Sequence, residues 1–192
     1  MSEAVQIGRL DLAPASAHRG LLADPVAAAL EDAALQDASF ADVAVAAIDP
    51  GLADTAAFCA AYDVPLEISA NCVVVAGKRD GEQRIAACVV LATTRADVNG
   101  IVKRRLDVRK ASFLSMDEAV AQSGMEYGGI TPLGLPLGWP VLVDDAVAAL
   151  SWVIIGSGLR RSKLAIPGAA LARLAARGSG GVVPGIAVGT AT

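Results

Sequence analysis

The sequence predicts an α+β domain with a mixed central β-sheet surrounded by helices. Short apolar segments with the period of strands alternate along the chain with segments that have the period of helices. Glycine and proline mark many of the boundaries between these segments. Hydrophobic residues make up 54% of the 192 residues, but aromatic residues make up only 4%. We therefore expect a tightly packed core of Ala, Val, Leu and Ile.

The first third of the chain predicts two helices and one strand. Proline in the first turn favours a helix over residues 25–35, and residues 42–48 have the apolar pattern of a strand. A second helix is expected over residues 52–62, with Asp54 or Thr55 near its start.

The middle of the chain predicts the centre of the sheet. Residues 71–76 and 84–92 are apolar enough to be buried strands, and the Asp-Gly pair at 80–81 is typical of a hairpin turn. Apolar residues on one face predict a helix over residues 96–106, and a short strand follows over 110–114.

A capping box opens the next helix. Ser115 and Glu118 have the S-x-x-E spacing in which two side chains satisfy the free amides of a first turn. The remaining expected elements are strands over 141–143, 152–155 and 162–166, and a helix over 167–176 that begins with a proline.

The chain length suits a single domain, which we place at residues 1–176. Residues 1–51 are expected to form an N-terminal extension packed on this domain. From Gly178 onward the chain has no charge and no apolar period, which predicts a flexible tail over 177–192. The first twelve residues lack the apolar run of a signal peptide, and glycines and prolines exclude a membrane span. We therefore expect a cytoplasmic protein.

Cysteine and histidine offer little for catalysis. Cys59, Cys72 and Cys88 lie on apolar segments without C-x-x-C spacing, which predicts buried, reduced thiols. His18 is the one histidine of the chain, so neither a Ser-His-Asp triad nor a histidine-ligated metal has its usual residues. We expect no metal and no cofactor.

The charge is unevenly divided along the chain. Residues 1–80 carry a net charge of −8 and residues 81–192 a net charge of +4. Much of the positive excess lies in a group that we call the basic stripe, which consists of Lys103, Arg104, Arg105, Arg109 and Lys110. A solvated helix face and a surface that binds phosphates both fit this pattern.

Residues 125–135, with the sequence MEYGGITPLGL, are too rich in glycine and proline for a helix or strand, and we call them the glycine loop. Gly128 and Gly129 lack Cβ atoms, so a ligand could approach their main chain closely, and Pro132 restricts the loop before a ligand arrives. A simple connecting turn is the alternative. The segment therefore predicts either a turn or a loop that binds with its main chain.

This order of motifs resembles the YbaK/EbsC family of free-standing aminoacyl-tRNA deacylases, which is related to the editing domain inserted in some prolyl-tRNA synthetases. The family's GG-[IV]-[ST]-P-[FLV]-G loop matches residues 128–134. Its strand ending in Asp matches at Asp144, and its S-G-x-[KR]-[RG] turn matches at residues 157–161. The resemblance covers residues 52–174.

The resemblance implies hydrolysis of the ester of a mischarged tRNA without a metal or a covalent intermediate. The expected partners are the aminoacylated 3′ end of tRNA and an aminoacyl-tRNA synthetase, with no role for DNA or membranes. The implied catalytic residues are Asn71, Gly128, Gly129 and Asp144, which we expect around a single cleft, with Gly128 and Gly129 positioning the ester carbonyl. Asp144 could equally be a strand cap. The implied substrate-binding residues are Ile130, Thr131, Pro132, Ser157, Gly158 and Arg160, and the basic stripe is expected to bind tRNA.

The chain departs from the family at one position. Asn71 stands where the family has a lysine at the start of a strand, so the charge of that hydrogen-bond donor is lost. Lys78 is too far along the strand to replace it, and Cys72 should point away from Asn71. Two hypotheses remain, namely a deacylase and a protein of the same fold that binds aminoacyl-tRNA ends or a small aminoacyl ligand without turnover.

Overall fold

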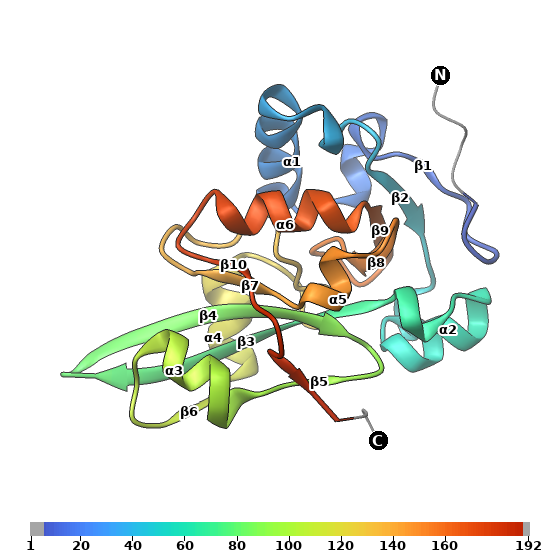
Figure 1. Cartoon of the computed structure of the whole chain (residues 1–192). Helices are drawn as coiled ribbons and strands as arrows, with labels where there is room; N and C mark the ends of the chain where they lie inside the picture. The colour runs from blue at the N-terminus through green and yellow to red at the C-terminus, as the bar shows by residue number, and fades with distance from the viewer. Residues whose placement is uncertain (1–5, 190–192) are drawn as a thin grey trace.

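The computed structural model describes residues 6–189 and shows two main sheets with helices around them (Figure 1). The helices are α1 (Asp24–Gln36), α2 (Thr55–Tyr62), α3 (Lys103–Leu106), α4 (Met116–Ser123), α5 (Asp145–Ala148) and α6 (Gly168–Ala176). The strands are β1 (Ala13–Pro14), β2 (Ala44–Ala47), β3 (Ala70–Arg79), β4 (Glu82–Leu91), β5 (Arg95–Ala96), β6 (Ala111–Phe113), β7 (Val141–Val143), β8 (Val153–Gly156), β9 (Ser162–Ile166), β10 (Gly181–Val182) and β11 (Ala187–Val188). None of the helices between residues 6 and 189 has the length and apolar character needed to cross a membrane.

The strand directions confirm the predicted α+β fold with a mixed sheet. The central sheet has the order β10-β7-β4-β3-β6, in which β7 runs parallel to both β10 and β4. Strand β3 runs antiparallel to β4 and β6. A second, antiparallel sheet has the order β1-β2-β9-β8 and meets the first at a bridge between Ser69 and Ile154. A small sheet pairs β5 with β11.

The β3–β4 hairpin is the longest element of the central sheet. Its register runs without a break from Ala70 opposite Leu91 to Arg79 opposite Glu82. Asp80 and Gly81 connect the strands with φ angles of +52° and +88°, which are the angles that a two-residue turn needs. In Figure 1 the hairpin extends away from the body of the protein, with α3 and β6 beside its far half.

Helix starts follow the local signals in two places and depart from them in a third. The Asp54 carboxylate accepts hydrogen bonds from the first turn of α2, and the capping box of Ser115 with Glu118 opens α4. The predicted helix over residues 96–106 is instead β5, a π-helical turn and α3. The helical part starts after β5, because the Asp97 side chain accepts from the amides of Gly100 and Ile101 and so caps the π-helical turn that continues into α3.

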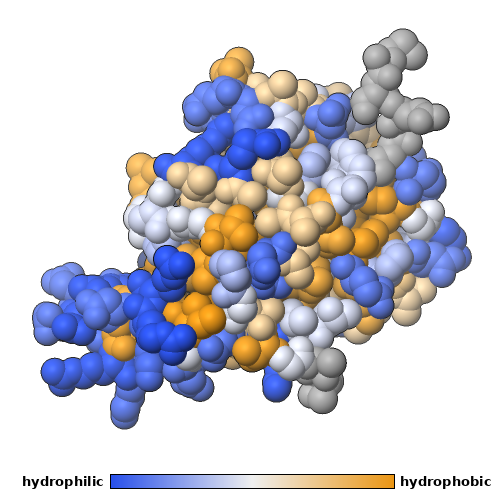
Figure 2. All heavy atoms as spheres, viewed as in Figure 1, coloured by the Kyte–Doolittle hydropathy of each residue, from blue (hydrophilic) through white to orange (hydrophobic). Residues whose placement is uncertain are grey.

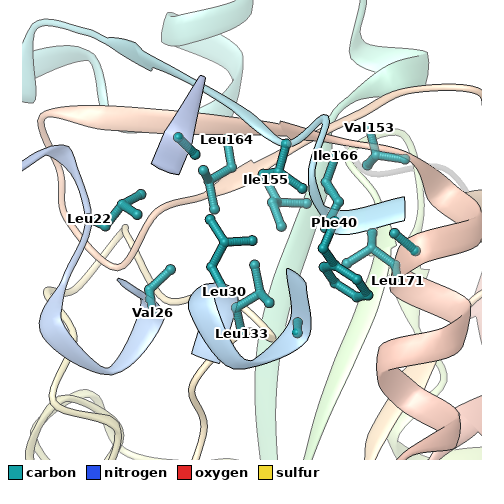
Figure 3. Close-up of a cluster of buried hydrophobic side chains, with 14 of the residues drawn as sticks. Leu22, Val26, Leu30, Phe40, Leu133, Val153, Ile155, Leu164, Ile166 and Leu171 are labelled. Carbon is teal, nitrogen blue, oxygen red and sulfur yellow. The ribbon is translucent and has the colours of Figure 1, made fainter. Parts of the chain in front are cut away.

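The largest buried cluster lies between α1, α6 and the four-stranded sheet (Figure 3). Leu30 of α1 and Leu171 of α6 approach Leu164 and Ile155 of this sheet, and Leu133 of the glycine loop packs into the same cluster. The core is aliphatic, as the composition predicts. Strands β1 and β2 complete the sheet against β9, so the part of the N-terminal extension from residue 6 onward belongs to the core.

The prediction of a flexible tail is wrong for residues 181–188. Strand β10 pairs with β7, and β11 pairs with β5. Val183 and Ile186, between these strands, are 3% and 0% exposed. Two-residue strands are too short to show a period in the sequence, and the surface that receives them comes from distant parts of the chain. Residues 190–192 lie outside the described residues.

Candidate functional site

A cavity of about 550 Å³ lies at the start of β3, between α2, the segment from β6 to α4 and the glycine loop. Its apolar wall includes Val74, Phe113, Leu114, Met116, Ala119 and Ile130. Its polar wall includes Asp54, Thr55, Asn71, Arg160 and Lys163, together with the main chain around Gly128. A concave site with one apolar and one polar wall suits a small ligand that has an apolar part and a polar group.

Asn71 lies in the polar wall and is held by a neighbour. The Thr55 hydroxyl, in the first turn of α2, donates a hydrogen bond of 2.7 Å to Asn71 Oδ1. The amide nitrogen of Asn71 then remains available as a donor, because the carbonyl end of the side chain is occupied. Two residues earlier, Ser69 Oγ lies 3.2 Å from Cys59 Sγ, and this contact connects the start of β3 to α2. Asn71 and Gly128 therefore line one cavity, as the sequence predicts.

The two central glycines of the glycine loop have different roles. Gly128 has a φ of +81° and lines the cavity. Gly129 is buried and lies outside the cavity wall, with its amide bonded to Glu126 O at 2.9 Å and its carbonyl to the amide of Gly158 at 2.8 Å. A Cβ on Gly129 would lie 2.7 Å from the Leu159 backbone. In place of the expected contact with the ester, Gly129 joins the loop to the turn over residues 157–161.

Four of the expected substrate-binding residues are buried beside the cavity and do not line it. Thr131 and Pro132 are buried in the loop, and the Thr131 hydroxyl has no hydrogen-bond partner among the described residues. Ser157 Oγ lies 2.8 Å from Ser162 Oγ, and the Gly158 carbonyl accepts from the amide of Glu126. Ser157 and Gly158 shape the turn through these contacts, and Thr131 and Pro132 are enclosed within the loop.

Arg160 and Ile130 do line the cavity. The Arg160 guanidinium donates to the carbonyl of Tyr127 and to the carbonyl of Pro50, both at 3.1 Å. Its own amide donates to the Glu126 carboxylate. Arg160 therefore connects the glycine loop to the segment before α2 across the rim of the cavity.

Asp144 lies outside the cavity, contrary to the expectation that it shares a cleft with Asn71. It is 4% exposed at the end of β7, where its amide bonds to Val89 O at 3.0 Å. Burial raises the pKa of the Asp144 carboxyl, with the neighbouring Asp145 as the next cause. Asp144 follows β7, and Asn71 lies on β3. Strand β4 lies between these two strands in the sheet and separates the two side chains.

Lys163 is a cavity residue that the sequence analysis did not include. It lies on β9 and is 7% exposed, and its Nζ donates to Ala53 O at 3.1 Å. The ammonium also lies 5.2 Å from the centre of the Phe58 ring. A lysine inside the buried strand SKLAI was the available signal, because lysine is rarely buried without a reason.

The nucleophiles of the cavity are restricted. Burial raises the pKa of the Cys72 thiol far above its ordinary value, so the thiolate is not available at neutral pH. His18 lies at the surface, with Nδ1 3.0 Å from Pro14 O, and takes no part in the cavity. Among residues 6–189, no group of His, Cys, Asp and Glu side chains could hold a metal ion.

A second cavity of about 470 Å³ adjoins the first and shares Asn71, Val73 and Phe113 with it. Its remaining lining comes mainly from β5 and the π-helical turn, including Arg95, and from Val188 of β11. The tail therefore supplies part of a cavity wall.

The basic stripe lies on the half of the molecule that holds the far end of the hairpin. Ala111, next to Lys110, pairs with Gly77, which is six residues or about 20 Å along β3 from Asn71. Arg79 and Arg84 of the hairpin are paired with Asp107, whereas the stripe makes no salt bridge among the described residues. Figure 2 shows hydrophilic side chains gathered over this end of the molecule.

Comparison with known protein families identifies the class of protein to which this fold and cavity belong. A model of the "Aminoacyl-tRNA editing domain" family matches residues 49–174, and the chain belongs to this family. The family assignment confirms the resemblance seen in the sequence. An editing domain implies interaction with aminoacyl-tRNA or a synthetase in general terms. No curated protein matches the chain by sequence.

Solved structures support the same fold. The protein is similar to a "putative trans-editing enzyme for prolyl tRNA synthetase", with a TM-score of 0.69 and 18% identity, covering 84% of this chain and 94% of that one. It is also similar to the "hypothetical protein APE2540", with a TM-score of 0.68 and 18% identity, covering 83% of this chain and 99% of that one. The TM-scores establish a shared fold, and at 18% identity the activity has to be argued from the residues of the site.

Proposed function

We propose that this protein hydrolyses the ester bond of a mischarged aminoacyl-tRNA, acting in trans as a deacylase. The observation that carries the proposal is the cavity in which Asn71, Gly128 and the apolar side chains of β3 and α4 meet. Membership of the aminoacyl-tRNA editing domain family supports the same conclusion.

The two adjoining cavities suit an aminoacylated 3′ end. The apolar wall would receive the amino-acid side chain, and the polar wall would face the ester. The second cavity, which shares Asn71 with the first, offers Arg95 and apolar side chains to the terminal nucleoside. The basic stripe, about 20 Å along β3, would contact phosphates of the acceptor stem.

The chemistry would depend on positioning. Water attacks the ester carbonyl, the bond to the ribose oxygen breaks, and the proton lost by water reaches that oxygen. The described part of the cavity has no histidine and no ionised thiol, so the usual histidine-activated nucleophiles are missing there and we assign the attack to water. The amide nitrogen of Asn71 and the main chain of Gly128 would hold the carbonyl, while a ribose hydroxyl assists proton transfer.

The test is a panel of tRNAs, each charged with a correct or an incorrect amino acid, incubated with the purified full-length protein. We expect accelerated release of an incorrect amino acid from at least one tRNA. Gly128→Ala should reduce the rate because it adds a Cβ beside the ester at a φ of +81°. Gly178→Ala is the matched control, since a Cβ there meets no atom within 4 Å.

Tight binding of aminoacyl-tRNA with no acceleration on any member of the panel would contradict the proposal. It would favour the non-catalytic binding protein, for which the uncharged side chain at position 71 is the supporting observation. Equal rates in Gly128→Ala and Gly178→Ala would place the chemistry away from the glycine loop.

A further inference from the structure

Lys163 is a cation at the polar wall of the cavity, and no carboxylate of residues 6–189 forms an ion pair with it. It makes no salt bridge within residues 6–189, although salt bridges occur elsewhere on the surface. Within the part of the chain that the structure describes, Nζ donates one hydrogen bond, to the Ala53 carbonyl. An ammonium has three donors, so two remain. Burying an ammonium that forms no ion pair costs stability, which favours a functional reason for its retention.

The surroundings of Lys163 hold the ammonium at the cavity wall. Phe58 and Cys59 of α2 lie on one side, and the Phe58 ring, 5.2 Å from Nζ, favours a cation at this position. The charged groups that face it are Asp54 at the start of α2 and Arg160 in the turn before β9. Burial lowers the pKa of Lys163, Cys59 and Asp54 act in the opposite direction, and Arg160 lowers the pKa further.

Lys163 also adjoins the glycine loop. On the neighbouring strand β8 its register partner is Gly156, which also lines the cavity. A Cβ on Gly156 would lie 2.4 Å from the Gly129 carbonyl oxygen, so β8 and the loop are in close contact. The lysine, the loop and Asn71 thus border the same space, although Asn71 is on a different sheet.

We propose that Lys163 is a catalytic residue that donates a hydrogen bond to the substrate carbonyl oxygen as this oxygen becomes an oxyanion. The inference rests on the proposed deacylase function. Water adds to the carbonyl carbon and the bond to the ribose oxygen then breaks, while the proton from water passes to the ribose. Lys163 remains protonated throughout and supplies charge stabilisation that the neutral Asn71 amide cannot.

The test compares Lys163→Met with Lys78→Met in the full-length protein. Methionine keeps the length and apolar stem of lysine, and Lys78 is an exposed lysine on β3 that lines neither cavity. On a tRNA that the wild type deacylates, Lys163→Met should lower kcat by roughly 100-fold and raise KM by at most about 10-fold, because the hydrogen bond strengthens as the oxyanion forms, and Lys78→Met should keep the wild-type kcat. Lys163→Met should melt at or above the wild-type temperature, because it removes a buried charge.

The pH profile separates a catalytic cation from a structural one. Since burial lowers the pKa of Lys163, the wild-type rate, corrected for spontaneous ester hydrolysis, should fall on the alkaline side below the ordinary lysine range. Lys163→Arg, which stays charged, should move this decline to higher pH. A kcat for Lys163→Met equal to that of Lys78→Met, or an alkaline limb unchanged in Lys163→Arg, would overturn the inference.

Binding distinguishes failure of the inference from failure of the proposed function. If the wild type deacylates no tRNA, the deacylase proposal fails. The inference is then judged with an aminoacyl adenosine whose ester is replaced by an amide. About 10-fold weaker binding to Lys163→Met than to Lys78→Met supports a contact between Lys163 and the carbonyl. Equal binding to both variants, or no binding to the wild type, overturns it.

Discussion

Truncating Ile186 tests whether the C-terminal segment is part of the folded domain. The Ile186 side chain is 0% exposed and belongs to a buried cluster with Val102 and Leu142. Its carbonyl accepts from the amide of Asp97 at 2.7 Å, which joins the segment to β5. Removing a fully buried isoleucine side chain leaves a cavity and also loses the transfer free energy of its methyl and methylene groups.

We expect Ile186→Ala to lower the free energy of unfolding by about 2–5 kcal/mol. For a domain of this length, that loss corresponds to a decrease in melting temperature of roughly 5–15 °C. Thermal unfolding followed by circular dichroism, together with urea denaturation, measures both quantities. Val182→Ala is the matched control, because Val182 is in the same segment but 38% exposed, and it should change stability by less than about 0.5 kcal/mol.

Equal melting temperatures for Ile186→Ala and Val182→Ala would refute the reasoning, because the segment would then contribute no buried surface. Loss of the Ile186 side chain should also disturb the second cavity, because Val188, in the same segment, lies in its wall. We therefore expect the destabilised variant to bind the aminoacyl adenosine amide more weakly, at a temperature at which it is still folded.

Three further predictions concern the tRNA surface, the loop and the departure at position 71. Charge reversal of Lys103, Arg104 and Arg105 together should weaken the binding of all tRNAs similarly and reduce the dependence of the affinity on salt concentration. An unchanged salt dependence would mean that these residues are only a solvated helix face. Gly129→Ala should lose about 1–3 kcal/mol of stability because its Cβ would lie 2.7 Å from backbone atoms, whereas a wild-type melting curve would show that the loop adjusts freely. In the deacylation assay, Asn71→Lys should raise kcat by roughly 10- to 100-fold through a charged hydrogen bond, and a rate no higher than wild type would mean that another residue supplies the charge.

The Asn71→Lys result also bears on Lys163. Both side chains line the same cavity, so a second ammonium would meet the charge of the first. If Lys163 already stabilises the oxyanion, the benefit of Asn71→Lys should be larger in the Lys163→Met background. A double-mutant cycle on kcat measures this coupling, and additive effects would indicate that the two positions act independently.

Local signals were sufficient for the elements that define the centre of the fold. The Asp-Gly pair at 80–81 predicted the hairpin because a two-residue turn needs positive φ angles that these residues tolerate. The spacing of Ser115 and Glu118 predicted the start of α4, since a capping box satisfies amides within four residues. The glycine loop was recognisable as a shaped segment, and the family motif around it placed Asn71 and Gly128 together.

Other features were beyond the reach of the sequence because they depend on distant surfaces. Gly129 and Asp144 share the motif with Gly128, but only the packing of Leu159 and the order of strands decide which of them meets the cavity. The helical part starts after residue 96 because Arg95 and Ala96 pair with β11, near the end of the chain, and the segment that predicted the helix does not contain that partner.

The sequence by itself determined the α+β class, the hairpin, the capped helices and the family, because each depends on periodicity, turn chemistry or a motif within a short stretch. Only the tertiary structure decided that the tail is paired with other strands and that Lys163 is buried at the cavity. The tail is held by strands and a hydrophobic surface far from it in sequence, and Lys163 meets the Ala53 carbonyl across 110 residues. Burial and charge at such positions are properties of contacts between segments, which a pattern along one segment does not contain.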